Sequence, residues 1–99
     1  QYIEEYYHLE KLPKYYAGLL NITTKHLNRV TKETLNKTTH QLIAERVILE
    51  AKRLIVHSQN PLARIAEALG FEDYAYFSRY FKKKTGTSPI DFKKSYHKK

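Results

Sequence analysis

Residues 70–92 read GFEDYAYFSRYFKKKTGTSPIDF, a stretch that carries the signals of one helix with both of its ends. Asp73 precedes the helical pattern and is a residue type that caps helix N-termini with its side chain. Gly86 follows the pattern and suits the left-handed conformation in which many helices end. The stretch therefore predicts a helix over about residues 74–84, with Pro89 opening the next helix at its first turn.

The phase of this helix separates a core-facing side from an exposed side. The residues at core spacing are all aromatic: Tyr76, Phe77, Tyr80 and Phe81. On the opposite side, four residues are candidates for contacts with base edges of duplex DNA: Tyr74, Ala75, Ser78 and Arg79. An arginine can form two hydrogen bonds to guanine, and a serine hydroxyl can pair with several base edges.

The same pattern occurs twice in the chain. Four residues around a first turn match four later ones at a spacing of 49: Ala17, Leu20, Asn21 and Ile22 with Ala66, Leu69, Gly70 and Phe71. After a one-residue insertion the spacing is 50: Leu27 with Phe77, Arg29 with Arg79, Lys32 with Lys82, Asn36 with Gly86, and Thr38 with Ser88. Turn residues match turn residues and core positions match core positions, so each copy is predicted to be a helix-turn-helix unit.

The periodicity is helical nearly throughout and predicts an all-α, seven-helix fold. The helices are expected at about residues 1–11, 13–20, 24–35, 39–58, 60–70, 74–84 and 89–97. We expect one domain over residues 1–99, with helix-turn-helix units at about 13–36 and 61–86 joined by the long central helix at about 39–58. One face of that helix gathers apolar residues: Ile43, Val47, Ala51 and Leu54.

In the first unit, Thr23 or Thr24 can cap the second helix of the pair, and Leu27 and Val30 are expected to point inward. Its candidates for base contacts are the outward residues Lys25, Asn28 and Arg29. An asparagine side chain matches the donor and acceptor on the edge of adenine. The candidates for phosphate contacts in the two units are Thr24, His26, Lys32, Lys82, Lys83 and Lys84.

The charge of the chain favours a polyanionic partner. The net charge is +8, of which the first fifty residues carry +1 and the remainder +7. Each phosphate that a protein neutralises releases condensed counterions, so such a charge favours nucleic acid. The absence of cysteine excludes disulfides and thiolate metal sites, and it is typical of a reducing compartment.

No group of residues points to catalysis. The five histidines, which share no i, i+4 spacing for a zinc pair, are His8, His26, His40, His57 and His97. The acidic residues read as solvated helix faces, and no glycine-rich phosphate loop occurs. We therefore expect no catalytic residue, no metal and no cofactor.

Two other kinds of partner remain open. Nine Tyr and four Phe could stack on the bases of RNA or single-stranded DNA. A basic helical protein-interaction module is a further alternative, and it can coexist with DNA binding. A membrane-surface helix fits poorly because the lysines are spread over several helices, and no apolar run approaches the roughly 20 residues of a membrane span.

The stretch at residues 70–92 resembles the C-terminal signature of AraC/XylS-type regulators, and the resemblance extends over essentially the whole chain. It implies a transcription regulator with seven helices and two helix-turn-helix units, whose recognition helices enter successive major grooves of duplex DNA. The first unit departs from the pattern. Val30-Thr31 and Leu35-Asn36 stand where the family often has an aromatic residue and a Thr-Gly pair.

The resemblance also implies partners beyond the DNA. The chain begins at Gln1 and contains no Met, so we expect it to be part of a longer protein. Its N-terminal part would then hold an effector-binding or dimerisation domain, and RNA polymerase is a further expected partner. A regulator of this kind is expected in the cytoplasm, associated with the nucleoid.

Overall fold

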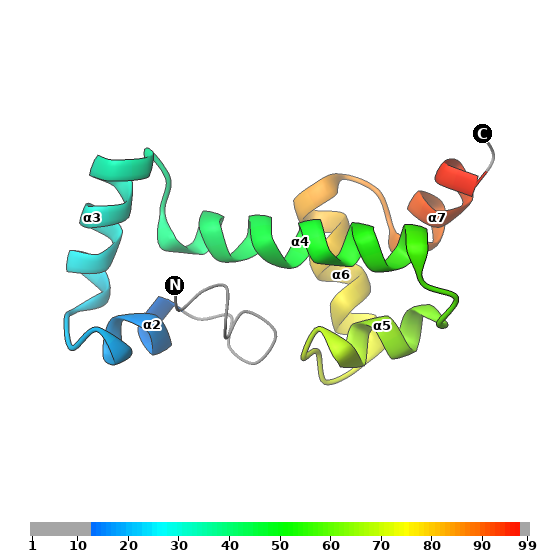
Figure 1. Cartoon of the computed structure of the whole chain (residues 1–99), viewed down its shortest axis with the longest axis horizontal. Helices are drawn as coiled ribbons and strands as arrows, with labels where there is room; N and C mark the ends of the chain where they lie inside the picture. The colour runs from blue at the N-terminus through cyan, green and yellow to red at the C-terminus, as the bar shows by residue number, and fades with distance from the viewer. Residues whose placement is uncertain (1–12, 98–99) are drawn as a thin grey trace. The chain divides into compact units, whose positions relative to one another are not determined.

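The computed structural model describes residues 13–97 and places six α-helices there (Figure 1). They are α2 (Pro13–Leu19), α3 (Thr24–Leu35), α4 (Thr39–His57), α5 (Leu62–Ala68), α6 (Tyr74–Thr85) and α7 (Pro89–His97). These bounds confirm six of the seven expected helices to within two residues at each end. The helix expected over residues 1–11 lies outside the described residues.

The chain divides into two compact units, with the boundary between Arg46 and Val47 inside α4. The first unit holds α2, α3 and the start of α4, and the second holds the rest of α4 with α5, α6 and α7. That the whole chain behaves as a single domain stays a prediction.

The helix ends follow the local signals of the sequence. Thr23 accepts a hydrogen bond from the backbone N–H of His26 at 3.0 Å, and Asp73 accepts one from Tyr76 at 2.7 Å. Both are N-cap contacts that satisfy backbone donors left without an intrahelical partner. Between residues 13 and 97, the left-handed conformation occurs just after α2, α3, α5 and α6, at Asn21, Asn36, Gly70 and Gly86.

The core of the second unit is aromatic. Phe77 and Phe81 are fully buried on α6, and the Phe71 ring lies 5.2 Å from the ring centres of both Phe77 and Tyr80. Ala66 of α5 is also buried. The prediction that Tyr76 belongs to the core-facing side is wrong. Its ring lies edge-on to Phe71, but the residue remains 48% exposed.

In the described part of the first unit, one expected core residue is wrong. Val30 is 39% exposed, whereas Thr31 is buried beside Leu27. At about 100° per residue, Thr31 lies only about 40° round the helix from Leu27, while Val30 lies about 60° away on the other side. The same phase holds in α6, where Phe81 takes the place of Thr31.

The buried face of α4 keeps a strict four-residue spacing through Ile43, Val47, Ala51 and Ile55. Ile55, and not the expected Leu54, completes this face, since Leu54 is only half-buried. Each step of four residues drifts by about 40°, so this row winds through about 120° around α4 between Ile43 and Ile55.

Candidate nucleic-acid interface

The two predicted copies share their backbone hydrogen bonds as well as their residue pattern. Ile22 donates to the carbonyl of Ala17 at 3.0 Å, and Phe71 donates to Ala66 at 3.0 Å. The N–H groups of Asn21 and Gly70, one residue earlier, each bond to the carbonyl three residues back at 3.0 Å. Both copies therefore present the second helix of the pair from the same turn.

The equivalence continues past the second helix. Asn36 and Gly86 each donate to the lysine carbonyl four residues back, at 2.9 and 2.7 Å. Thr38 and Ser88 then cap the next helix, each accepting a backbone N–H three residues on at 3.1 Å. The repeat inferred from the sequence is thus a repeat of the backbone from the first turn to the start of the following helix.

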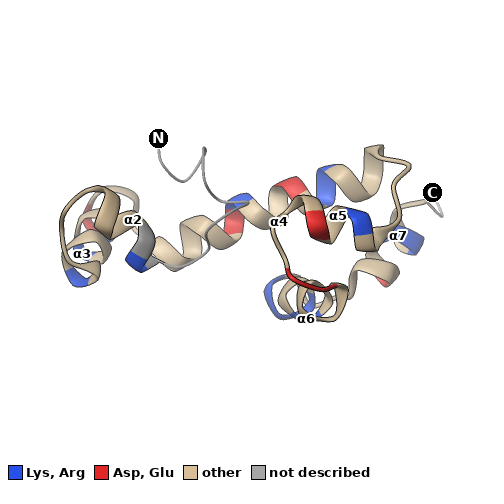
Figure 2. Ribbon diagram, turned by 90° about the horizontal axis from the view of Figure 1, so that it is seen from below, with Lys and Arg blue, Asp and Glu red and all other residues tan. Residues whose placement is uncertain are grey.

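In the second unit, the exposed side of α6 is basic. Ala75, Arg79 and Lys83 stand four residues apart and are all exposed, with Lys82 and Lys84 beside them. The helix itself contains no acidic residue; the carboxylates nearest in sequence, Glu72 and Asp73, lie before its first turn (Figure 2). Such a face offers one arginine for base edges and several lysines for phosphates.

Two predicted contact residues of α6 are less exposed than this row, and a third, Lys84, lies over a ring of its own helix. Ser78 is half-buried. Tyr74 is also half-buried, and its hydroxyl is inaccessible and has no hydrogen-bond partner. The Lys84 Nζ lies 5.6 Å from the centre of the Tyr80 ring, a distance suited to a cation–π contact. The DNA contacts of all three stay predictions, but the Tyr74 hydroxyl is turned into the protein.

Burial also affects the chemistry of Tyr80. The pKa of its phenol rises from 10.0 to about 12, first because burial disfavours the charged form and then because Tyr76 lies close by. This tyrosine therefore stays neutral at physiological pH and acts as a packing residue.

In the first unit, the predicted contact residues gather around an open depression of about 630 Å³. It is lined by the α3 residues Lys25, His26, Asn28, Arg29 and Lys32, together with Thr23 and Thr38. The Arg29 guanidinium lies 3.3 Å from Nδ1 of His26. Lys25, His26, Arg29 and Lys32 are exposed, while Thr24 is half-buried. The depression thus joins base and phosphate candidates on one surface.

Asn28 has a role that the sequence pattern did not reveal. Its Oδ1 accepts a hydrogen bond from the backbone N–H of Thr39 at 3.0 Å, in a part-buried position. The base contact predicted for Asn28 stays a prediction, but its acceptor oxygen is already engaged inside the protein.

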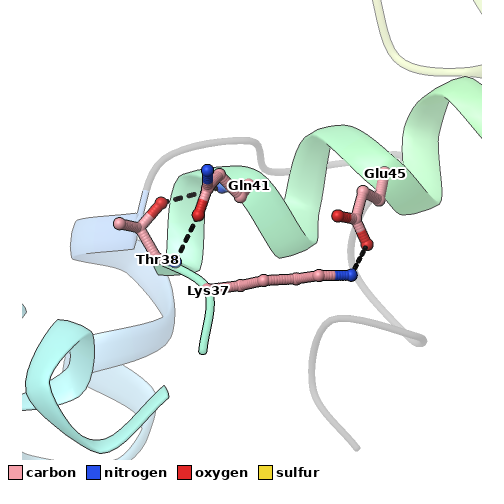
Figure 3. A network of polar contacts seen from close by, with 4 residues as sticks. All are labelled: Lys37, Thr38, Gln41 and Glu45. Carbon is pink, nitrogen blue, oxygen red and sulfur yellow. Dashed lines mark hydrogen bonds and ion pairs between the residues drawn. The ribbon is translucent and has the colours of Figure 1, made fainter. Parts of the chain in front are cut away.

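The segment between α3 and α4 is fixed by polar contacts (Figure 3). Thr38 and Gln41 bond reciprocally, with the Thr38 N–H donating to the Gln41 side chain at 2.7 Å. This is a capping box, in which two backbone donors are satisfied at once. Lys37 pairs with Glu45 at 2.9 Å, but both side chains are well exposed, so the pair adds little stability.

Other kinds of site are not found between residues 13 and 97. No group of three or more His, Asp or Glu side chains in that range could hold a metal ion. None of the helices described there is long and apolar enough to cross a membrane.

The chain matches known proteins over most of its length. The family model described as "Helix-turn-helix domain" matches residues 16–95. An uncharacterised HTH-type transcriptional regulator of Bacillus subtilis, YisR, is 32% identical over 94 residues, which are 95% of this chain and 33% of that protein. The arabinose operon regulatory protein of Escherichia coli is 46% identical over 46 residues, which are 46% of this chain and 16% of that protein.

Solved structures share the fold. The C-terminal domain of AraT, a response regulator from Geobacillus stearothermophilus, superposes with a TM-score of 0.86 at 29% identity, over 96% of this chain and 79% of that one. The DNA-binding domain of AdpA, solved with a target DNA, has a TM-score of 0.79 at 20% identity, over 93% of this chain and 83% of that one.

The chain spans a third or less of the length of these two curated relatives. The family match, in contrast, covers both helix-turn-helix units and the helix between them. The chain therefore belongs to the helix-turn-helix domain family of AraC/XylS-type transcription regulators.

Proposed function

We propose that this chain binds specific sequences in duplex DNA and thereby directs transcription regulation, with α3 and α6 as its recognition helices. The observation that carries the proposal is the backbone repeat. Two turns with matching hydrogen bonds present Arg29 and Arg79 at equivalent exposed positions on a chain of net charge +8. Exposed arginines on helices of this motif are suited to guanine edges in the major groove.

The two helices are proposed to enter successive major grooves of one duplex. Successive grooves on one face of DNA are about 34 Å apart. The 19 residues of α4 give a helix about 28 Å long, and this helix runs from one unit into the other. A bound site would then contain two short blocks of preferred bases about one helical turn apart.

The proposed base contacts are Lys25, Arg29, Ala75, Ser78 and Arg79. Asn28 and Tyr74 were also expected to contact bases, but the Asn28 oxygen is bonded to Thr39 and the Tyr74 hydroxyl is buried, so neither group is included here. The proposed phosphate contacts are Thr24, His26, Lys32, Lys82, Lys83 and Lys84. Exposure supports nine of these residues: Lys25, His26, Arg29 and Lys32 on α3, and Ala75, Arg79, Lys82, Lys83 and Lys84 on α6.

The whole protein is proposed to be a longer intracellular regulator. Its N-terminal part would bind an effector or dimerise, and it would act on RNA polymerase in the cytoplasm. The support is the length of the relatives, of which this chain matches about a third or less.

Selection of bound sites from a random duplex pool tests the proposed function. We expect two conserved blocks about one helical turn apart, and an affinity that falls steeply as salt rises because lysines and arginines displace counterions. Single-stranded oligonucleotides of the selected sequence serve as the control. Equal binding of single strands and duplex would contradict groove reading and favour the stacking alternative.

A further inference from the structure

The bond between Asn28 and Thr39 satisfies a donor that the helix cannot satisfy by itself. Thr39 is the first residue of α4, and the first N–H groups of a helix have no intrahelical acceptor. Thr39 is 1% exposed, so solvent cannot serve as that acceptor either. The Asn28 side chain, eleven residues earlier on α3, supplies the oxygen at 3.0 Å.

In the second unit, the first residue of the corresponding helix has no N–H donor that would need an acceptor. The residue equivalent to Thr39 is Pro89, which is also fully buried, opens α7 and has no N–H. The residue equivalent to Asn28 is Ser78. None of the hydrogen bonds in the described part of the chain involves the Ser78 hydroxyl, so this side chain does not serve as an acceptor for the start of α7. The difference between Asn28 and Ser78 therefore follows the first residue of the next helix, which has an N–H donor at Thr39 and none at Pro89.

This difference bears on how each helix can read bases. To recognise adenine, an asparagine carboxamide must turn its oxygen and its nitrogen together toward one base edge. The carboxamide of Asn28 is short and is oriented by its bond to Thr39, so its oxygen faces the start of α4. Ser78 is under no such constraint.

We infer that Asn28 is a positioning residue that holds α3 against the start of α4, and that base selection at this position falls to Ser78 of α6 alone. A proline at position 39 would remove the bond and release Asn28 to read adenine. The inference rests on the proposed function for its DNA-binding half, while its structural half stands on the hydrogen bond.

The structural half is tested by measuring the cost of Asn28→Ala in two backgrounds. Thr39→Ala keeps the N–H group, and Thr39→Pro removes it as Pro89 does in the second unit. In the Thr39→Ala background we expect the folded-to-unfolded ratio in urea to fall roughly five- to thirty-fold on Asn28→Ala, as for a part-buried donor left unpaired. In the Thr39→Pro background the change should be less than about twofold. Equal losses in both backgrounds would overturn the inference.

Asn28→Asp provides a second measurement that does not depend on the proline variant folding. Its carboxylate keeps an acceptor in the same place and lies at a helix N-terminus, where negative charge is favourable. This variant should hold the wild-type ratio at pH 7, whereas Asn28→Ala falls. If Asn28→Asp unfolds as readily as Asn28→Ala, the acceptor is not what matters.

The DNA-binding half is tested by site selection from a random duplex pool with four proteins: wild type, Asn28→Ala, Thr39→Pro and the double variant. Wild type and Asn28→Ala should select the same bases. Thr39→Pro should gain a preference for adenine at one position, and the double variant should lose it. A preference that disappears from the wild type on Asn28→Ala, or no gain in Thr39→Pro, would overturn this half. If no protein selects any duplex, the proposed function fails. The urea measurements then still show whether the bond between Asn28 and Thr39 stabilises the fold.

Discussion

Replacing the Tyr74 hydroxyl by hydrogen should make the protein more stable and leave DNA binding intact. The hydroxyl is inaccessible to solvent and has no hydrogen-bond partner. Burying such a group without a partner costs about 1–3 kcal/mol. The void left by one oxygen, about 10 Å³, costs only about 0.2 kcal/mol at about 24 cal/mol per Å³. For Tyr74→Phe we therefore expect a gain of about 1 kcal/mol in the free energy of unfolding.

Urea unfolding followed by circular dichroism measures this gain, and Tyr76→Phe is the matched control. Tyr76 lies two residues further along the same helix but is 48% exposed, so its solvated hydroxyl should contribute little to stability. Binding to a selected duplex should change less than twofold in both variants. A loss of stability in Tyr74→Phe would refute the burial argument. A tenfold loss of affinity would mean that the hydroxyl turns outward to the DNA.

Three further outcomes follow from single features of the structure. Arg79→Ala should cost roughly 1–3 kcal/mol of binding free energy and relax the preference at one base, whereas Lys83→Ala should lower the affinity for all duplexes alike. Quantitative gel shifts on matched and mutated sites measure both effects, and a base-selective loss for Lys83→Ala would contradict its phosphate role. Gly18→Ala should stabilise the fold by up to about 1 kcal/mol, since the added Cβ meets no atom within 4 Å. Gly86→Ala should destabilise the fold because the φ of Gly86 is +88°. Thermal unfolding measures both variants, and a gain in stability for Gly86→Ala would refute the argument from φ. The contribution of Tyr80 to stability should be constant below pH 10 and be lost between pH 10 and 12, because the folded state holds the Tyr80 proton more tightly than the unfolded state does. Over that range, stability should fall less steeply for Tyr80→Phe than for wild type, and an unchanged slope would exclude this tyrosine as a cause of the fall.

The helix boundaries could be predicted because their signals are local. Thr23 and Asp73 each bond to a backbone N–H only three residues away, and Asn36 and Gly86 each end a helix by their own backbone conformation. Such contacts are written into a few adjacent residues, so they can be read without knowing what packs against the helix.

The direction of individual side chains was predicted less well, because it depends on what covers each helix. Val30 and Tyr76 both lie at the margin of a buried row, where a change of a few tens of degrees decides between core and solvent. The Tyr74 hydroxyl carries no sequence signal of its burial, since an exposed tyrosine at the start of a recognition helix looks the same.

The role of Asn28 was missed, although the repeat contained the signal for it. An outward asparagine on a basic helix is typical of a residue that reads adenine, and nothing near it in sequence suggests otherwise. The signal lies eleven residues later, where Thr39 has an N–H group and its counterpart Pro89 has none. Comparing the copies for backbone donors, as well as for residue types, would have indicated that one copy needs an acceptor.

Two copies of one scaffold can come to differ in how they read DNA because of this one backbone donor. The backbone bonds of the turns are the same in both units, so the scaffold itself gives neither helix an advantage. A proline at the start of α7 removes a buried donor at no cost to the helix, because the first N–H of a helix has no partner within it. The side chain at position 78 then needs no hydrogen bond to the start of α7 and can change with the DNA site. Position 28 cannot change as freely, because a residue that does not accept the hydrogen bond from Thr39 leaves a buried donor unpaired and lowers stability. The freedom of a recognition helix to acquire a new specificity is therefore set partly by the first residue of the helix that follows it.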